Sequence, residues 1–99
     1  MTALSYAQKH DIVREDMRNL DALVRRTLGT PLYCYTVVIP RHLVIDGNIA
    51  RSADMADYLA ARALDGAEAF IDDDPLYNQA IELTNAALAA AETARSFLN

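Results

Sequence analysis

Apolar residues recur at spacings of three and four through the first part of the chain, the pattern of an amphipathic helix. Gly29 follows this segment and Pro31 lies two residues beyond, a combination typical of a helix end. We therefore predict a helix from Ser5 to Leu28. Its apolar face holds Tyr6, His10, Val13, Met17, Leu20, Val24 and Leu28.

Ile12 and Leu23 lie outside this apolar face. A helix with apolar residues on two sides can bury two surfaces. The pattern therefore favours a second contact of this helix, with a partner.

Residues 32–39 form the one segment that is dense in β-branched and aromatic side chains, which favours a β-strand. Pro40 ends the segment, and residues 42–45 follow as a second apolar run. We predict a short two-stranded β-ribbon. Because Pro40 and Arg41 are poor residues for a two-residue hairpin, a single bent strand or strands that pair with another subunit are alternatives.

Two further helices are predicted, over residues 48–71 and 75–97, each with an apolar line at alternating spacings of four and three. Asn48 or Ser52 can cap the first of them, and an aspartate followed by Pro75 can start the second. The first line is Ile49, Ala53, Ala56, Ala60, Ala63, Ala67 and Phe70; the second is Leu76, Ala80, Leu83, Ala87, Ala90, Ala94 and Phe97. Small residues along both lines predict an antiparallel αα-hairpin with axes about 8 Å apart.

The predicted fold class is α+β: one domain over residues 1–99, in the order helix, two-stranded ribbon, helix, helix. A ribbon alone in water is marginally stable, and both of its faces are apolar. The last helix also has an apolar face wider than one neighbour can cover, and the first helix adds Ile12 and Leu23. These features together predict a two-fold homodimer.

Charge and composition narrow the classes of partner. The net charge is −5, which argues against direct nucleic-acid binding. The acidic excess lies in the middle of the chain, because residues 46–82 hold nine acidic and two basic residues. A single cysteine, no signal-peptide pattern and no apolar run near the ~20 residues that span a bilayer predict a cytoplasmic protein outside membranes.

Few residues in the sequence are candidates for catalysis or metal binding. Cys34, His42 and Asp46 are residue types that can act as nucleophile, base and orienting group, but a cysteine among apolar neighbours is usually inert packing. Neither histidine belongs to a metal-binding motif, and consecutive acids at Asp72, Asp73 and Asp74 are more simply a helix cap than a cation site. We therefore predict no catalytic residue, no cofactor and no metal.

Two sets of residues are candidates for partner binding. An acidic stripe on the second long helix contains Asp54, Asp65, Glu68 and Asp72, and is either a solvated face or a surface for a basic partner. Tyr33 and Tyr35, with Arg41 and His42 at the predicted bend, are residue types enriched at interfaces. The alternative is that both tyrosines belong to the core.

The predicted function is non-enzymatic: a small acidic protein that self-associates and regulates or inhibits a partner protein by binding it. One alternative is a small-molecule-binding or catalytic domain with a site around Cys34, His42 and Asp46. Another is an acidic mimic of nucleic acid that blocks a nucleic-acid-binding protein.

Overall fold

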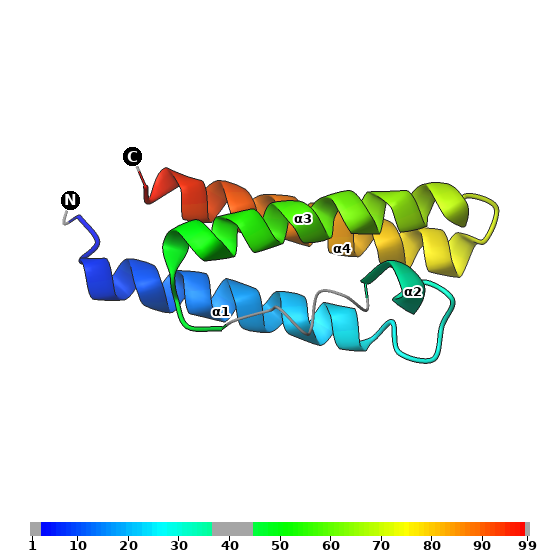
Figure 1. Cartoon of the computed structure of the whole chain (residues 1–99), viewed down its shortest axis with the longest axis horizontal. Coiled ribbons are helices and arrows are strands. Elements are labelled where there is room, and N and C mark those ends of the chain that lie inside the picture. The colour runs from blue at the N-terminus through cyan, green and yellow to red at the C-terminus, as the bar shows by residue number, and fades with distance from the viewer. Residues whose placement is uncertain (1–2, 37–44, 99) are drawn as a thin grey trace.

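A computed structural model of the chain describes residues 3–36 and 45–98. These residues form four helices: α1 (Tyr6–Arg25), α2 (Tyr33–Thr36), α3 (Ile49–Ala69) and α4 (Asp74–Ser96). The helices α3 and α4 run antiparallel and in close contact, and α1 lies along them parallel to α3 (Figure 1). The architecture is a small helical bundle, with the short α2 packed at the end near the α3–α4 turn.

The prediction of an α+β fold with a β-ribbon is wrong. Residues 33–36, placed in the first strand by their β-branched and aromatic character, form α2, and the described parts of the chain contain no strand. Leu32 and Thr36, one helical turn apart, are both fully buried. Thr36 Oγ1 lies 3.0 Å from Thr27 Oγ1, also buried, so a hydrogen bond ties α2 back to the turn after α1.

Tertiary contacts therefore override the local preference for a strand. The remainder of the predicted ribbon, residues 37–44, lies outside the described residues.

Side-chain caps set the starts of the three long helices. Ser5 and Gln8 form a reciprocal capping box at α1, in which Ser5 Oγ accepts from the Gln8 N–H and Gln8 Oε1 accepts from the Ser5 N–H. Asn48 caps α3 through the Arg51 N–H at 2.9 Å. Asp73 caps α4 through the Leu76 N–H at 3.2 Å, so Pro75 lies in the first turn, where a missing N–H costs nothing.

The predicted αα-hairpin is confirmed. We call the two facing alanine-rich lines the seam. Apart from its end residues Phe70, Leu76 and Phe97, every predicted seam residue is buried, and Ala63 and Ala87 have no exposed surface. Because alanine side chains are short, the two backbones approach closely along the whole hairpin.

Helix α1 supplies the larger apolar side chains that cover one side of the hairpin. Val13, Met17, Leu20 and Val24 are at most 2% exposed. The predicted apolar face was too long, because Tyr6 is 73% exposed and the helix ends before Leu28, which is 53% exposed. The core therefore joins these large residues of α1 to the mostly small buried residues of α3 and α4.

Substituting the seam alanines tests how close the helices are. Ala60→Leu and Ala87→Leu should each lower the free energy of unfolding by about 1–3 kcal/mol, because extra methyl groups overpack a filled interface. Ala61→Leu, at an exposed position of α3, is the matched control and should change stability by less than about 0.5 kcal/mol. Urea unfolding measures all three variants, and equal effects at Ala60 and Ala61 would show that the seam is loosely packed.

Candidate functional site

The first candidate site is the side of α3 that points away from the seam. We call this surface, formed by Asp54, Tyr58, Asp65 and Glu68, the outer face of α3. All four residues are exposed, and Tyr58 is 52% exposed. Because the opposite side of α3 is locked in the seam, these side chains project from a rigid helix.

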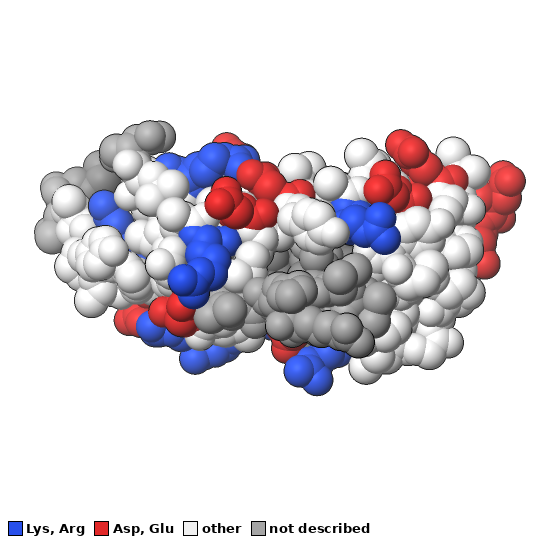
Figure 2. Space-filling model, in the orientation of Figure 1, with Lys and Arg blue, Asp and Glu red and all other residues white. Residues whose placement is uncertain are grey.

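The outer face carries acidic charge with little local compensation. Asp65 Oδ2 lies 3.6 Å from Arg62 Nη1, a solvent-exposed pair, and no ion pair forms between Asp54 or Glu68 and another described residue. The fourth predicted acid, Asp72, lies beyond the end of α3 in the turn before α4. Acidic side chains gather at this end of the molecule (Figure 2).

The basic residues of α1 do not neutralise this surface. Arg14, Arg18 and Arg25 pair with acids three or four residues away on α1 itself: Asp11, Glu15 and Asp21. Such exposed pairs contribute little to stability, typically less than about 1 kcal/mol. The acidic side chains of the outer face, Asp54, Asp65 and Glu68, therefore remain exposed without ion pairs to α1.

The tyrosines predicted to bind a partner are half-buried parts of the α2 region. The Tyr35 ring packs edge-on against Phe70, with ring centres 5.9 Å apart. The Arg62 guanidinium lies 5.5 Å from the same ring, and Arg62 Nε donates to the Tyr35 carbonyl at 3.1 Å. Tyr35 thus anchors α2 to α3. Partner binding by Tyr33 and Tyr35 stays a prediction, and Arg41 and His42 lie outside the described residues.

The structure does not bring Cys34 and Asp46 together. Cys34 lies on α2 beside Tyr35, whose side chain packs near Gly66 at the far end of α3. Asp46 precedes the start of α3, where it pairs with Arg51 at 2.8 Å and accepts from the Asn48 N–H. At 1.5 Å per helical residue the two sites are about 25 Å apart, and His42 lies outside the described residues.

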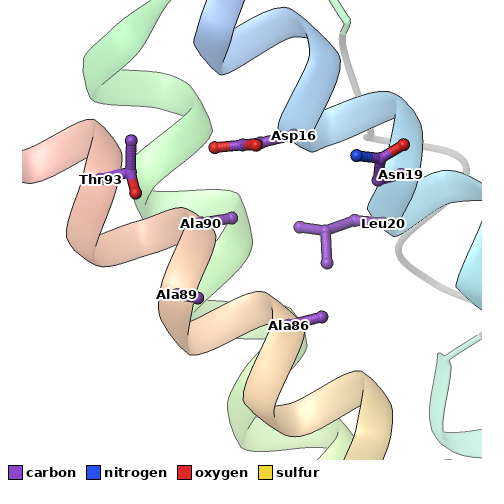
Figure 3. Close-up of a pocket in the computed structure, with 7 residues that line it drawn as sticks. All are labelled: Asp16, Asn19, Leu20, Ala86, Ala89, Ala90 and Thr93. Atoms are coloured by element: carbon purple, nitrogen blue, oxygen red, sulfur yellow. The ribbon is translucent and has the colours of Figure 1, made fainter.

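A second candidate site, which the sequence analysis did not identify, is a groove between α1 and α4. Its volume is about 210 Å³. Leu20 and the α4 alanines form an apolar floor, and polar side chains stand at its edges. Figure 3 shows Asp16 and Leu20 projecting from α1 toward α4. The lining residues are Asp16, Asn19, Leu20, Ala86, Ala89, Ala90 and Thr93.

Contacts between α1 and α4 flank this groove along the helices. Toward the N-terminus of α1, Lys9 Nζ lies 5.8 Å from the centre of the Phe97 ring. Toward the other end, Arg26 Nη1 lies 3.6 Å from Glu82 Oε1, and Gln79 Nε2 donates to the Arg26 carbonyl at 3.0 Å. The groove is thus a bounded opening in the middle of the α1–α4 interface.

Asp16 is the charged residue that lines the groove. Partial burial, and secondarily the neighbouring charge of Glu15, raise the pKa of the Asp16 carboxyl above its usual value. No basic side chain among the described residues pairs with it. The groove therefore contains a partly desolvated carboxylate that lacks a counter-charge from these parts of the chain.

One signal in the sequence points toward this groove. Ile12, Asp16, Asn19 and Leu23 follow each other at spacings of four, three and four, so they form one stripe on α1. Ile12 and Leu23 were the apolar residues that indicated a second contact surface. In the structure, part of this second surface belongs to the chain's own core, because Leu23 packs against the core.

Within residues 3–36 and 45–98, no group of three or more His, Cys, Asp or Glu side chains is arranged to hold a metal ion. No helix in these ranges is both long enough and apolar enough to cross a membrane. Neither a protein-family model, nor a curated protein, nor a solved structure matches this chain.

Removing the charge of Asp16 should stabilise the fold near neutral pH. Because its folded-state pKa is raised, the native state holds this proton more tightly than the unfolded chain, and stability falls as pH rises through the range above 3.8. Asp16→Asn should therefore raise the melting temperature at pH 7 and lose this advantage below pH 3.8. Thermal unfolding at pH 7 and pH 3 measures the effect.

Asp54→Asn is the control, because Asp54 is an exposed acid of α3. Its melting temperature at pH 7 should stay close to that of the native chain, because substitutions at exposed positions change stability little. A lower melting temperature for Asp16→Asn at pH 7 would show that the carboxylate stabilises the fold.

Proposed function

We propose that the protein acts by binding another protein through the outer face of α3, and that it regulates or inhibits this partner. The observation that carries the proposal is Tyr58, half-exposed beside the acidic residues of a helix whose other side is fixed in the seam. A tyrosine offers a large, rigid contact area at low entropic cost, and tyrosine is enriched among the residues that dominate binding energy.

The chemistry of this face favours a basic segment as its ligand. An arginine or lysine side chain can stack on the Tyr58 ring while it pairs with the neighbouring carboxylates of Asp54 or Asp65. Exposed acids at the edge of such an interface act mainly on the association rate and its salt dependence. The rigid helix keeps the cost of ordering low, because its backbone is already fixed.

The acidic end of the hairpin supports a more specific form of this proposal. Beyond Glu68 of the outer face, the exposed acids Asp72, Asp73 and Asp74 extend the negative charge to the α3–α4 turn (Figure 2). A protein that normally holds nucleic acid offers a complementary basic surface. In this form the chain acts as a nucleic-acid mimic, and we expect it to act in the cytoplasm.

Site-specific photo-crosslinking tests the proposal. A benzophenone amino acid in place of Tyr58 should capture a protein from lysate of the native host, with the crosslink in a lysine- or arginine-rich peptide. The same probe in place of Tyr6, a more exposed tyrosine on α1, is the matched control and should not capture it. Mass spectrometry identifies the products.

The charge of the outer face should determine the yield of this crosslink. The double variant Asp54→Lys, Asp65→Lys should reduce the yield at least tenfold with an unchanged melting temperature, because both side chains are exposed. Added salt should also reduce the crosslink yield, because it screens the charges of the outer face. Products that are identical at Tyr58 and Tyr6, or a yield insensitive to both changes, would contradict the proposal.

We also propose that the protein self-associates, now on the basis of fewer features than the sequence suggested. The ribbon that was expected to pair between subunits is replaced in part by α2. What remains is one side of the hairpin that α1 leaves uncovered. Leu64 and Leu88 are 45% and 49% exposed.

These leucines lie on the same side of the hairpin. Asp57 and Leu64 are seven residues apart on α3, as are Leu88 and Arg95 on α4, so each pair shares one helix face. Asp57 forms an ion pair with Arg95, which shows that these two faces meet. The partly buried Ile81 extends the apolar surface by a further two turns of α4.

Charge introduced at these leucines tests self-association. The native chain should sediment as a dimer at micromolar concentration, and Leu88→Lys should shift it to a monomer of unchanged helicity, because a buried lysine at a symmetric contact is costly. The control variant Leu28→Lys changes a similarly exposed leucine outside the hairpin, and this variant should remain dimeric. Monomer mass for the native chain across the concentration range would refute the dimer.

A further inference from the structure

The α1–α4 groove has the size of a site for a single small group. At about 210 Å³ it is smaller than the pockets that enclose drug-sized ligands, which begin at about 300 Å³. It is larger than an engineered protein cavity of about 150 Å³ that binds benzene. A ligand of a few heavy atoms, or one side chain of a larger molecule, therefore fits this volume.

The polar groups of the groove define the charge of that ligand. Asp16 projects into the space from α1, partly buried and without a basic partner among the described residues (Figure 3). The α4 side contributes the hydroxyl of Thr93 and no charged side chain. A partly desolvated carboxylate attracts a cation more strongly than an exposed one, because water competes less for both charges.

The floor of the groove defines the rest of the ligand. Leu20, Ala86, Ala89 and Ala90 offer an apolar surface beside the carboxylate. A hydrated inorganic cation cannot use this surface, whereas a chain of methylene groups gains by covering it. The three hydrogens of an ammonium group can be shared between Asp16 and the Thr93 hydroxyl.

We propose that the α1–α4 groove binds a primary alkylammonium group, with its aliphatic stem on the alanine floor and its charge at Asp16. The group can come from a free amine or from a lysine side chain of another molecule. This site lies on α1 and α4, whereas the proposed protein-binding surface lies on the outer face of α3. The two proposals therefore stand independently.

Titration of the ¹⁵N-labelled full chain with n-butylammonium chloride, followed by NMR, tests this proposal. At constant ionic strength, amide shifts should saturate at residues around Asp16, Ala90 and Thr93, with a dissociation constant on the order of millimolar for so small a ligand. 1-Butanol, which has the stem without the charge, and ammonium chloride, which has the charge without the stem, should each bind at least tenfold more weakly.

Two pairs of variants connect this binding to the groove. Asp16→Asn should weaken n-butylammonium binding at least tenfold while the protein remains folded, and Asp54→Asn, at an exposed acid of α3, should leave it unchanged. Ala89→Leu should block the groove from an exposed position, whereas Ala61→Leu, the same change at an exposed position of α3 outside the groove, should not. Equal binding by native protein and Asp16→Asn, or equal binding of butanol, would overturn the proposal.

A second ligand identifies the source of the amine. N-acetyl-lysine-methylamide carries the same ammonium and stem attached to a backbone. Binding of this compound at the affinity of n-butylammonium indicates that the groove accepts a lysine side chain. Binding of n-butylammonium alone indicates a site for a free amine. Binding of neither would refute the assignment.

Discussion

The close approach of α3 and α4 along their alanine seam is the constraint on which the rest of the structure depends. Alanine allows two helix backbones to lie near each other, but each alanine buries little apolar area. The seam alanines therefore position the helices without supplying most of the hydrophobic stabilisation. That contribution comes from larger buried side chains, namely Leu83 within the seam, Leu59 of α3, and Met17 and Leu20 of α1, all at most 1% exposed. A small domain with such a hairpin needs the third helix to complete its core.

The same use of small residues explains a glycine in the middle of a helical pattern. Gly66 lies inside α3 at a cost of about 1 kcal/mol relative to alanine, which locally favours a break in the helix. The helix nevertheless continues through Gly66. A Cβ atom at this position would lie 2.5 Å from Leu32 Cδ1, which is a steric clash. Gly66 therefore makes room for the fully buried Leu32, which holds the segment before α2 against α3. This contact, with the hydrogen bond between Thr27 and Thr36, takes the place of strand pairing in the first, described part of the predicted ribbon.

What could be predicted from the sequence depended on the range of the interactions involved. The seam was predictable because each of its helices repeats one periodicity over many turns, and the exposure of Asp54, Asp65 and Glu68 followed from the same periodicity. The segment after Leu32 was not predictable in this way. Its β-branched and aromatic residues favour a strand locally, and the helix is determined by contacts with the turn after α1 and with α3. The groove beside Asp16 depends on the separation of two helices far apart in sequence, which periodicity does not specify.

The groove and the seam are consequences of one property of α4, its small residues on more than one side. Ala87 and Ala94 face the seam, where short side chains bring α3 close. Ala86 and Ala89 lie on the side of α4 toward α1, and their side chains are equally short. Bulkier or charged side chains make the contacts between α1 and α4 at both ends of the groove, and one of these contacts joins Lys9 and Phe97. Large residues on this side of α4 would have filled the space. Their absence leaves the Asp16 carboxylate beside an open apolar floor, an arrangement that costs stability near neutral pH unless a cation occupies it.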